Sequence, residues 1–122
     1  MANRGPYAKG RERRDAILGA TVALFSTTGY RGTSFRAIAD ELGITATLIQ
    51  HYFPTREELL TEVIRAWDDQ NARASAGLPM IDAFLGNIRR NTRIPGLVRL
   101  YTAYAVESGD PDHAARPFFQ ER

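Results

Sequence analysis

The sequence of 122 residues predicts an all-α protein. Apolar residues recur at intervals of three and four along most of the chain, which is the periodicity of helices that bury one face. No segment has the strict alternation of apolar and polar residues that marks a half-buried strand. Hydrophobic residues make up 43% of the chain and charged residues 25%, so the composition indicates a globular domain rather than a disordered one.

The N-terminal segment is basic and precedes the first predicted helix. Residues 1–14 contain one acid, Glu12, and five basic residues, Arg4, Lys9, Arg11, Arg13 and Arg14. We expect residues 1–10 to form a flexible arm, and either attraction to phosphate or a solubilising role suits it. A helix should run from about Arg11 to Thr28 and stop at Gly29. Its apolar face comprises Ile17, Leu18, Thr21, Leu24 and Phe25.

Two short helices joined by a glycine follow. Thr33 or Ser34 can cap the first, and Gly43 can end it. Thr45 can cap the second, which stops before Pro54. This is the plan of a helix-turn-helix, in which the first helix braces the second so that the second enters a DNA major groove. We expect Ile44, Ile49 and Phe53 to pack inward and Thr45, Ala46, Thr47, Leu48 and His51 to face outward.

Four further helices are predicted downstream. Thr55 and Glu58 match a capping box at the start of a helix that continues to about Ser75. A break at residues 76–79 precedes a fifth helix, whose apolar residues are Ile81, Phe84, Leu85 and Ile88. A sixth enters through Ile94-Pro95-Gly96 and ends at Gly109-Asp110-Pro111, and a seventh begins within residues 112–122.

The sequence has no segment typical of secretion or of a membrane span. The basic N-terminal residues are not followed by an apolar stretch, and nothing later approaches a membrane-spanning length. There are no cysteines, so disulfides and thiolate metal sites are excluded. We therefore expect a soluble, cytoplasmic protein.

The residues around the helix-turn-helix have a distinctive spacing. Ile17-Leu18-Gly19-Ala20 is followed by Leu24-Phe25, Gly29-Tyr30, Thr33-Ser34-Phe35, Ile38-Ala39, Leu42-Gly43-Ile44-Thr45, Tyr52-Phe53, Arg56-Glu57 and Leu59-Leu60. Over residues 11–67 this pattern resembles the tetracycline-repressor (TetR) family of bacterial transcriptional regulators. The rest of the chain is compatible with the divergent helical C-terminal domain of that family.

The resemblance implies a homodimer built from a three-helix, homeodomain-like helix-turn-helix unit and a TetR-type helical domain. It divides the chain into a basic arm (1–10), a DNA-binding domain (11–54), a connecting helix (55–75) and a partial ligand-binding and dimerisation domain (76–122). Each subunit would read half of a palindromic operator in double-stranded DNA, and an unknown small-molecule effector would release it. Most members are repressors. Because members usually continue well past this length, we expect later residues to be missing here.

The resemblance also assigns roles to individual residues. It implies base contacts for Ala46, Thr47 and Leu48, and contacts to the DNA backbone for Thr33, Thr45, His51, Tyr52 and Arg56. Leu48 can contact a thymine methyl group. Gln50 stands where the family usually has tyrosine, and its amide can bond phosphate or adenine.

Other functional interpretations are weaker. Trp67, Phe84, Tyr101 and Tyr104 are candidates for the ligand pocket, although an aromatic residue at helical spacing is more often core. Asp110, Asp112 and His113 indicate a turn rather than a metal site. The basic cluster Arg89, Arg90, Arg93 and Arg99 is better explained as a solvated face. No catalytic motif is found, so we expect neither enzymatic activity nor a cofactor or metal.

The sequence is also compatible with a function of another class. A helical ligand-binding or protein-interaction module could keep the same architecture without reading DNA specifically. The substitution at Gln50 is its best support. Salt-steep DNA binding with no preferred site would favour this alternative.

Overall fold

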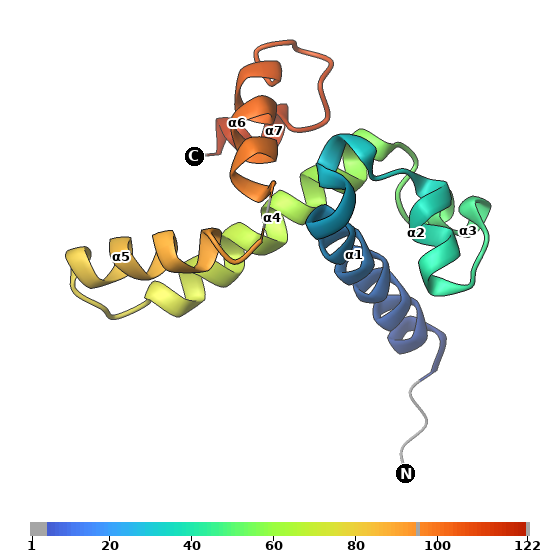
Figure 1. The fold of residues 1–122 in the computed structure, drawn as a ribbon, viewed down its shortest axis with the longest axis horizontal. Helices are drawn as coiled ribbons and strands as arrows, with labels where there is room; N and C mark the ends of the chain where they lie inside the picture. The colour runs from blue at the N-terminus through green and yellow to red at the C-terminus, as the bar shows by residue number, and fades with distance from the viewer. Residues whose placement is uncertain (1–4, 95, 122) are drawn as a thin grey trace.

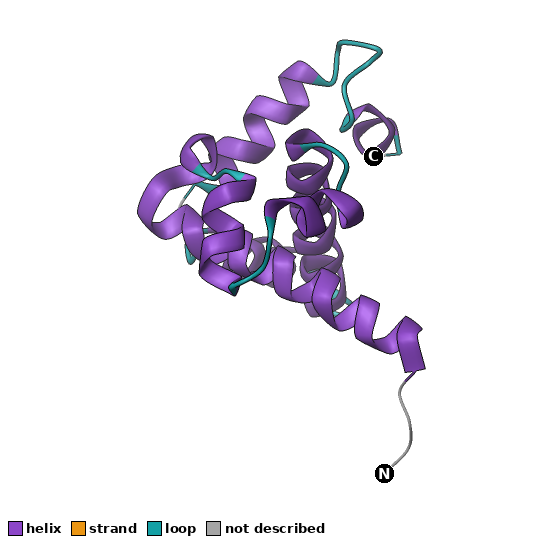
Figure 2. Ribbon diagram, turned by 90° about the vertical axis from the view of Figure 1, so that its right-hand side faces the viewer, coloured by secondary structure: helices purple, strands orange, loops and turns teal. Residues whose placement is uncertain are grey.

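The computed structural model of the protein describes residues 5–94 and 96–121. These residues form seven helices and no strand, joined by short loops (Figure 1, Figure 2). The helices are α1 (Gly5–Gly32), α2 (Phe35–Leu42), α3 (Ala46–Tyr52), α4 (Arg56–Ser75), α5 (Met80–Asn91), α6 (Leu97–Glu107) and α7 (Arg116–Gln120). The predicted all-α class is therefore confirmed.

Helix α1 begins at Gly5, so the predicted start at about Arg11 is wrong and residues 5–10 of the predicted arm are helical. Proline is compatible with a first helical turn, where its missing N–H has no partner to lose, and Pro6 occupies that turn. The residues that follow include good helix formers such as Lys9. Tyr7 and Arg11 are one helical turn apart, and the Arg11 guanidinium lies 5.8 Å from the centre of the Tyr7 ring. Residues 1–4 of the predicted arm lie outside the described residues.

Gly29 ends the regular helical backbone of the first part of α1, as the sequence predicts. Its φ of 65° and ψ of 170° are not helical, and a short second helical segment follows this kink up to Gly32. A side chain would make this left-handed φ costly, whereas glycine adopts it readily. The Thr33 hydroxyl donates a hydrogen bond of 2.9 Å to the carbonyl oxygen of Gly29, which fixes the turn that leads into α2.

The next helices have the ends that the sequence predicts. Ser34 caps α2 by accepting a hydrogen bond from the backbone N–H of Ala37, and Gly43 ends the helix with a left-handed φ of 67°. Thr45 caps α3 by accepting a hydrogen bond of 3.1 Å from the N–H of Leu48. Thr55 caps α4 in the same way, at 3.1 Å from the N–H of Glu58.

The C-terminal helices follow the predicted order but not every predicted boundary. Gly96 precedes α6 with a left-handed φ of 83°, whereas Pro95 of the predicted entrance lies outside the described residues. Helix α7 is a single short segment that begins at Arg116. Before it, the side chain of Asp110 accepts a hydrogen bond of 2.9 Å from the N–H of Asp112, which makes the predicted turn.

The buried apolar residues form two hydrophobic cores, and α1 and α4 contribute residues to both. The head core contains Ile17, Ala20, Ile38, Ala39, Ile49, Phe53 and Leu59. The body core contains Phe25, Tyr30, Leu60, Val63, Ile64, Leu97, Leu100, Tyr104, Ala115 and Phe118. Leu59 and Leu60 are neighbours in sequence, both are 0% exposed, and they belong to different cores. We call the head the unit of α2, α3 and the parts of α1 and α4 packed on them.

Helices α4 and α5 form a hairpin that extends away from the head (Figure 1). Helix α5 has no buried residue, and its large apolar side chains Met80, Ile81, Phe84, Leu85 and Ile88 are all exposed. The spacing of these residues therefore predicts the helix correctly. The apolar face that it also predicts is not buried by the rest of the chain. Among the described residues, no helix has both the length and the apolar character needed to cross a membrane.

Candidate DNA-binding surface

The outer side of α3 carries most of the residues for which DNA contacts are predicted. Thr45, Ala46, Thr47, Gln50 and His51 are exposed, and Leu48 and Tyr52 are half-buried. On the inner side, Ile49 and Phe53 are 0% and 2% exposed in the head core. Packing is thus concentrated on the side of Ile49 and Phe53, with Tyr52 at its edge, and the exposed side is available to a partner.

A groove of about 700 Å³ lies between α1 and α3. Lys9 and Arg13, one turn apart on α1, line it opposite Leu48 and Tyr52. Glu12 is the acidic residue among those that line the groove. The sequence alone did not indicate that Lys9 and Arg13 lie side by side. A spacing of four residues brings two side chains together only within a helix, and the predicted helix began after residue 9.

Thr33 does not lie where a phosphate contact would require it. Its side chain is 1% exposed, and its hydroxyl is bonded to the Gly29 carbonyl and lies 3.3 Å from the Thr28 hydroxyl. The contact with the DNA backbone that the resemblance implies for this hydroxyl is therefore not supported. The chain uses Thr33 to close the turn between α1 and α2.

Arg56 is also engaged within the protein. Its Nε donates a hydrogen bond of 2.6 Å to the carbonyl oxygen of Thr33, and its Nη2 donates another to the carbonyl oxygen of Tyr30. Two of its nitrogens thus hold the start of α4 against the end of α1. This differs from the phosphate contact that the resemblance implies, because a phosphate would compete with both carbonyls for the guanidinium.

Glu57, the next residue, binds the loop between α6 and α7. One carboxylate oxygen accepts a hydrogen bond of 2.5 Å from the N–H of Ala114, and the other lies 3.4 Å from His113 Nε2. The other ring nitrogen of His113 accepts a hydrogen bond of 3.0 Å from the N–H of Ala115. The first turn of α4 therefore contacts the head through Arg56 and the C-terminal loop through Glu57.

Tyr104 packs beside this loop, with its ring centre 4.7 Å from that of His113. Burial is the main cause that raises the pKa of Tyr104 to about 12, and the carboxylates of Glu57 and Glu107 act in the same direction. Its hydroxyl is therefore neutral at physiological pH. His113 thus packs against the Tyr104 ring, lies 3.4 Å from the Glu57 carboxylate and accepts a hydrogen bond within its own loop. Within the described residues, no group of three metal-ligating side chains is present.

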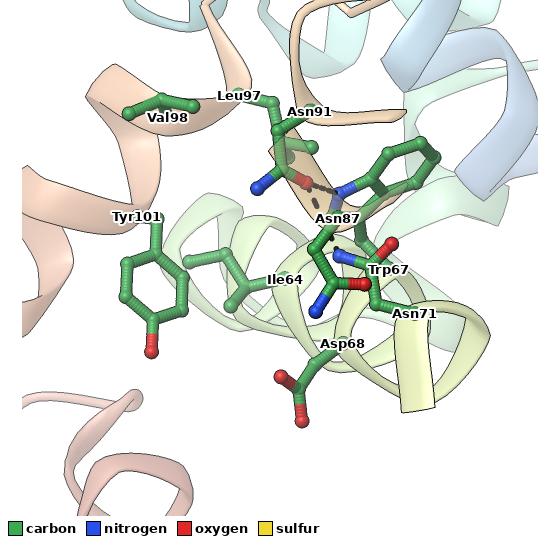
Figure 3. Close-up of a pocket in the computed structure, with 9 residues that line it drawn as sticks. All are labelled: Ile64, Trp67, Asp68, Asn71, Asn87, Asn91, Leu97, Val98 and Tyr101. Carbon is green, nitrogen blue, oxygen red and sulfur yellow. Dashed lines mark hydrogen bonds between the residues drawn. The ribbon is translucent and has the colours of Figure 1, made fainter. Parts of the chain in front are cut away.

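A second pocket, of about 240 Å³, lies between α4, α5 and α6 (Figure 3). Of the predicted ligand-binding aromatics, Trp67 and Tyr101 line it. Phe84 does not, because it lies on the outer side of α5 and is 59% exposed. Tyr104 does not either, because it is buried in the body core. No pattern in the sequence indicates the three asparagines of this pocket, Asn71, Asn87 and Asn91.

Comparisons with known proteins place the similarity mainly in the head. The family model described as bacterial regulatory proteins, tetR family, matches residues 17–63, from the middle of α1 into α4. The chain is 37% identical over 57 residues to the HTH-type transcriptional repressor KstR2 of Mycobacterium tuberculosis, a match to 47% of the chain and 28% of that protein. It is 38% identical over 53 residues to the HTH-type transcriptional regulator RutR of Escherichia coli, which covers 43% of the chain and 25% of RutR.

One similarity extends beyond the head. The chain is 32% identical over 121 residues to the HTH-type transcriptional repressor KstR of Mycolicibacterium smegmatis, a match to 87% of the chain and 59% of that protein. The chain therefore spans less than two thirds of the length of these relatives.

Proposed function

We propose that this chain is a transcriptional regulator that binds operator DNA through its head, because residues 17–63 match the family model of bacterial regulatory proteins, tetR family. One structural observation carries the proposal. Helix α3 has a buried inner side, and its outer side together with the cap Thr45 presents five exposed residues, 45–47, 50 and 51. A helix braced in this way can enter the major groove without disturbing the core.

Bases and phosphates would be contacted by different parts of the head. The outer side of α3 would meet base edges, with Thr47 and Leu48 near its start and Gln50 able to bond adenine. Lys9 and Arg13 would neutralise phosphates beside α3, since they line the groove that Leu48 shares. Thr45, His51 and Tyr52 would contact the DNA backbone at the two ends of the helix.

We further propose that the protein is a repressor that acts as a homodimer on a palindromic site and is released by a small molecule. Support comes from the similarity to proteins named repressors, KstR2 and KstR. The fold supplies a route for release, because α4 runs from the pocket at Trp67 to the contacts of Arg56 and Glu57 with the head and the C-terminal loop. A ligand that changed the position of α4 would alter the head directly.

The test is binding of the whole chain to genomic DNA fragments at two salt concentrations. We expect a preferred fragment whose affinity falls with salt, with a slope of about −0.9 for each phosphate neutralised. The preferred fragment should exceed random DNA by a factor on the order of 10³ or more at physiological salt. Equal, salt-steep binding to every fragment would contradict the proposal.

A further inference from the structure

The pocket between α4, α5 and α6 presents hydrogen-bond donors in a fixed arrangement. Its lining combines Trp67, Asp68 and Asn71 of α4 with two asparagines of α5, whereas α6 contributes apolar and aromatic side chains. An asparagine amide can present either its oxygen or its nitrogen to a ligand, depending on its orientation. The neighbours of Asn87 and Asn91 decide that orientation.

The orientation of Asn91 is set by Trp67. Trp67 Nε1 donates a hydrogen bond of 2.6 Å to Asn91 Oδ1, and Asn71 Nδ2 donates another of 3.1 Å to the same oxygen. An indole N–H can only donate, so the group beside it must be the oxygen of Asn91. The Nδ2 of Asn91 therefore lies on the other side of the amide.

The orientation of Asn87 is set by Arg90 in the same way. Its Oδ1 accepts a hydrogen bond of 2.9 Å from the Ser75 hydroxyl and another from Arg90 Nη2. A guanidinium can only donate, so it too requires an oxygen. Arg90 Nε also donates to Asn71 Oδ1 at 2.8 Å, which ties the residues behind the pocket into one network.

Both amide nitrogens consequently face the pocket. Figure 3 shows the nitrogen of Asn91 on the side where Ile64 and Tyr101 lie and the nitrogen of Asn87 directed toward Asp68, with both oxygens turned away from Ile64 and Tyr101. Neither nitrogen takes part in the hydrogen bonds that link these asparagines to Trp67, Asn71, Ser75 and Arg90. A ligand there meets N–H donors, and it satisfies them best with an acceptor oxygen.

The rest of the lining limits the ligand further. Ile64, Leu97 and Val98 offer apolar contacts, so the body of the ligand should be apolar. Among the described lining residues, Asp68 is charged and none is a lysine, arginine or histidine. A carboxylate would have to give up water without a cation beside it, and Asp68 would repel it. A carbonyl oxygen carries no net charge and has neither cost.

We infer that this pocket binds an uncharged, compact apolar molecule through a carbonyl oxygen that accepts hydrogen bonds from Asn87 and Asn91. A volume of about 240 Å³ lies just below the range of about 300–1,000 Å³ common for small-molecule sites, so the ligand is small. That this ligand acts as the effector rests on the proposed function, whereas its chemistry rests on the pocket alone.

The inference can be tested with three probes that share a cyclohexyl ring: cyclohexyl methyl ketone, cyclohexanecarboxylate and 1-cyclohexylethylammonium. The chain has one tryptophan, so Trp67 gives a single indole N–H resonance in an NMR titration of the whole chain. This N–H is bonded to Asn91, at the wall of the pocket. We expect the ketone to shift the resonance at lower concentration than the carboxylate, by about tenfold or more. We also expect it to act at lower concentration than the ammonium probe, which Asp68 attracts but which offers the two amide N–H groups no acceptor.

Asn91→Asp and Asn87→Asp are the decisive variants. Each keeps an oxygen for Trp67 or for Arg90 and replaces the donor nitrogen by an acceptor of the same shape. We expect each to weaken ketone binding about tenfold and to strengthen binding of the ammonium probe. Gln70→Glu is the matched control, because it makes the same amide-to-carboxylate change at an exposed position of α4 that does not line the pocket.

Three outcomes would overturn the inference: tighter binding of a charged probe by the unaltered chain, an unchanged preference in both variants, or no shift with any probe at millimolar concentration. Thermal unfolding followed by circular dichroism shows whether each variant is folded. The titration contains no DNA, so a failure of the proposed DNA binding leaves this result intact. Conversely, a chain that binds DNA but rejects the ketone contradicts only the inference.

Discussion

The Nε of Arg56 lies 2.6 Å from the carbonyl oxygen of Thr33, and this contact joins the first turn of α4 to the turn between α1 and α2. The same guanidinium also donates to the carbonyl oxygen of Tyr30. Because two donors of Arg56 are held by the protein, its main contribution should be to the position of the head. This relationship leads to the first prediction.

Replacing Arg56 by alanine should lower the free energy of unfolding by about 1.5–3 kcal/mol, since two carbonyls lose a charged donor. DNA binding should weaken for all sequences, while the slope of log affinity against log salt stays the same. Chemical denaturation and DNA titrations at several salt concentrations measure the two effects. Arg99→Ala, an exposed position on α6, is the control for the loss of charge. A slope reduced by about 0.9 would instead restore a phosphate contact to Arg56.

Thr47→Ala and Leu48→Ala should change which DNA sequence is preferred. Each replaced side chain lies on the outer side of α3, and a lost base contact costs about 1–3 kcal/mol at one position of the site. Selection from a random DNA library, performed with each variant, reports the change. Thr102→Ala on the exposed side of α6 serves as the comparison, and its selected site should be that of the unaltered chain.

The double variant Lys9→Ala and Arg13→Ala should reduce the salt slope by about 1.8, at about 0.9 for each phosphate contact. Its sequence preference should stay unchanged, because phosphates carry no base information. Affinities for the preferred site and one mismatched site, measured over a range of salt, separate the two properties. If the slope is unaffected, α1 does not contact phosphate and the groove beside α3 has another role.

Replacing Glu57 by alanine should free the loop between α6 and α7 from α4. The Ala114 N–H loses an acceptor 2.5 Å away that bears a negative charge, so its hydrogen exchange should accelerate about tenfold or more. Glu107→Ala removes an equal charge from α6 and should leave that exchange rate unchanged. Protection of Ala114 that survives in the Glu57 variant would show that another contact holds the loop.

The raised pKa of Tyr104 predicts that the folded chain loses stability in alkali. Its pKa is raised to about 12 in the folded chain from an unfolded value of 10.0. The neutral hydroxyl therefore contributes fully to the free energy of unfolding below pH 10, and this contribution is lost as the pH rises toward 12. The loss should be on the order of 1 kcal/mol after allowance for solvent screening. Tyr104→Phe removes it, so the difference in unfolding free energy between the two chains should change between pH 9 and 12. A constant difference would contradict the raised pKa.

The sequence predicts the helices of the head well because each has a strong local signal. Ser34, Gly43, Thr45 and Thr55 act at single positions, and their effect needs no distant partner. The start of α1 was missed for the opposite reason. Basic residues near a terminus are compatible with both a helix and a flexible arm, and no cap marks Gly5 as the beginning.

Contacts between distant residues could not be predicted from the pattern. Arg56 and Thr33 are separated by 23 positions, and their contact depends on how α4 crosses α1. Similarly, Trp67 and Asn91 meet only because α4 and α5 form a hairpin. Polar residues in such networks have no periodicity, so periodicity finds the helix of Asn87 and Asn91 but not their role.

The adjacent pair Leu59 and Leu60 has a consequence for how such a protein can diverge. Each is fully buried, one in the head core and one in the body core, so within α4 the boundary between the two cores falls at a single peptide bond. Phe25 and Tyr30 of α1 precede α2 and α3 in the sequence, yet they also belong to the body core. Exchange of the chain up to Leu59 would therefore carry the whole head core, and it would succeed only where the new residues at positions 25 and 30 still fit the rest of the body core.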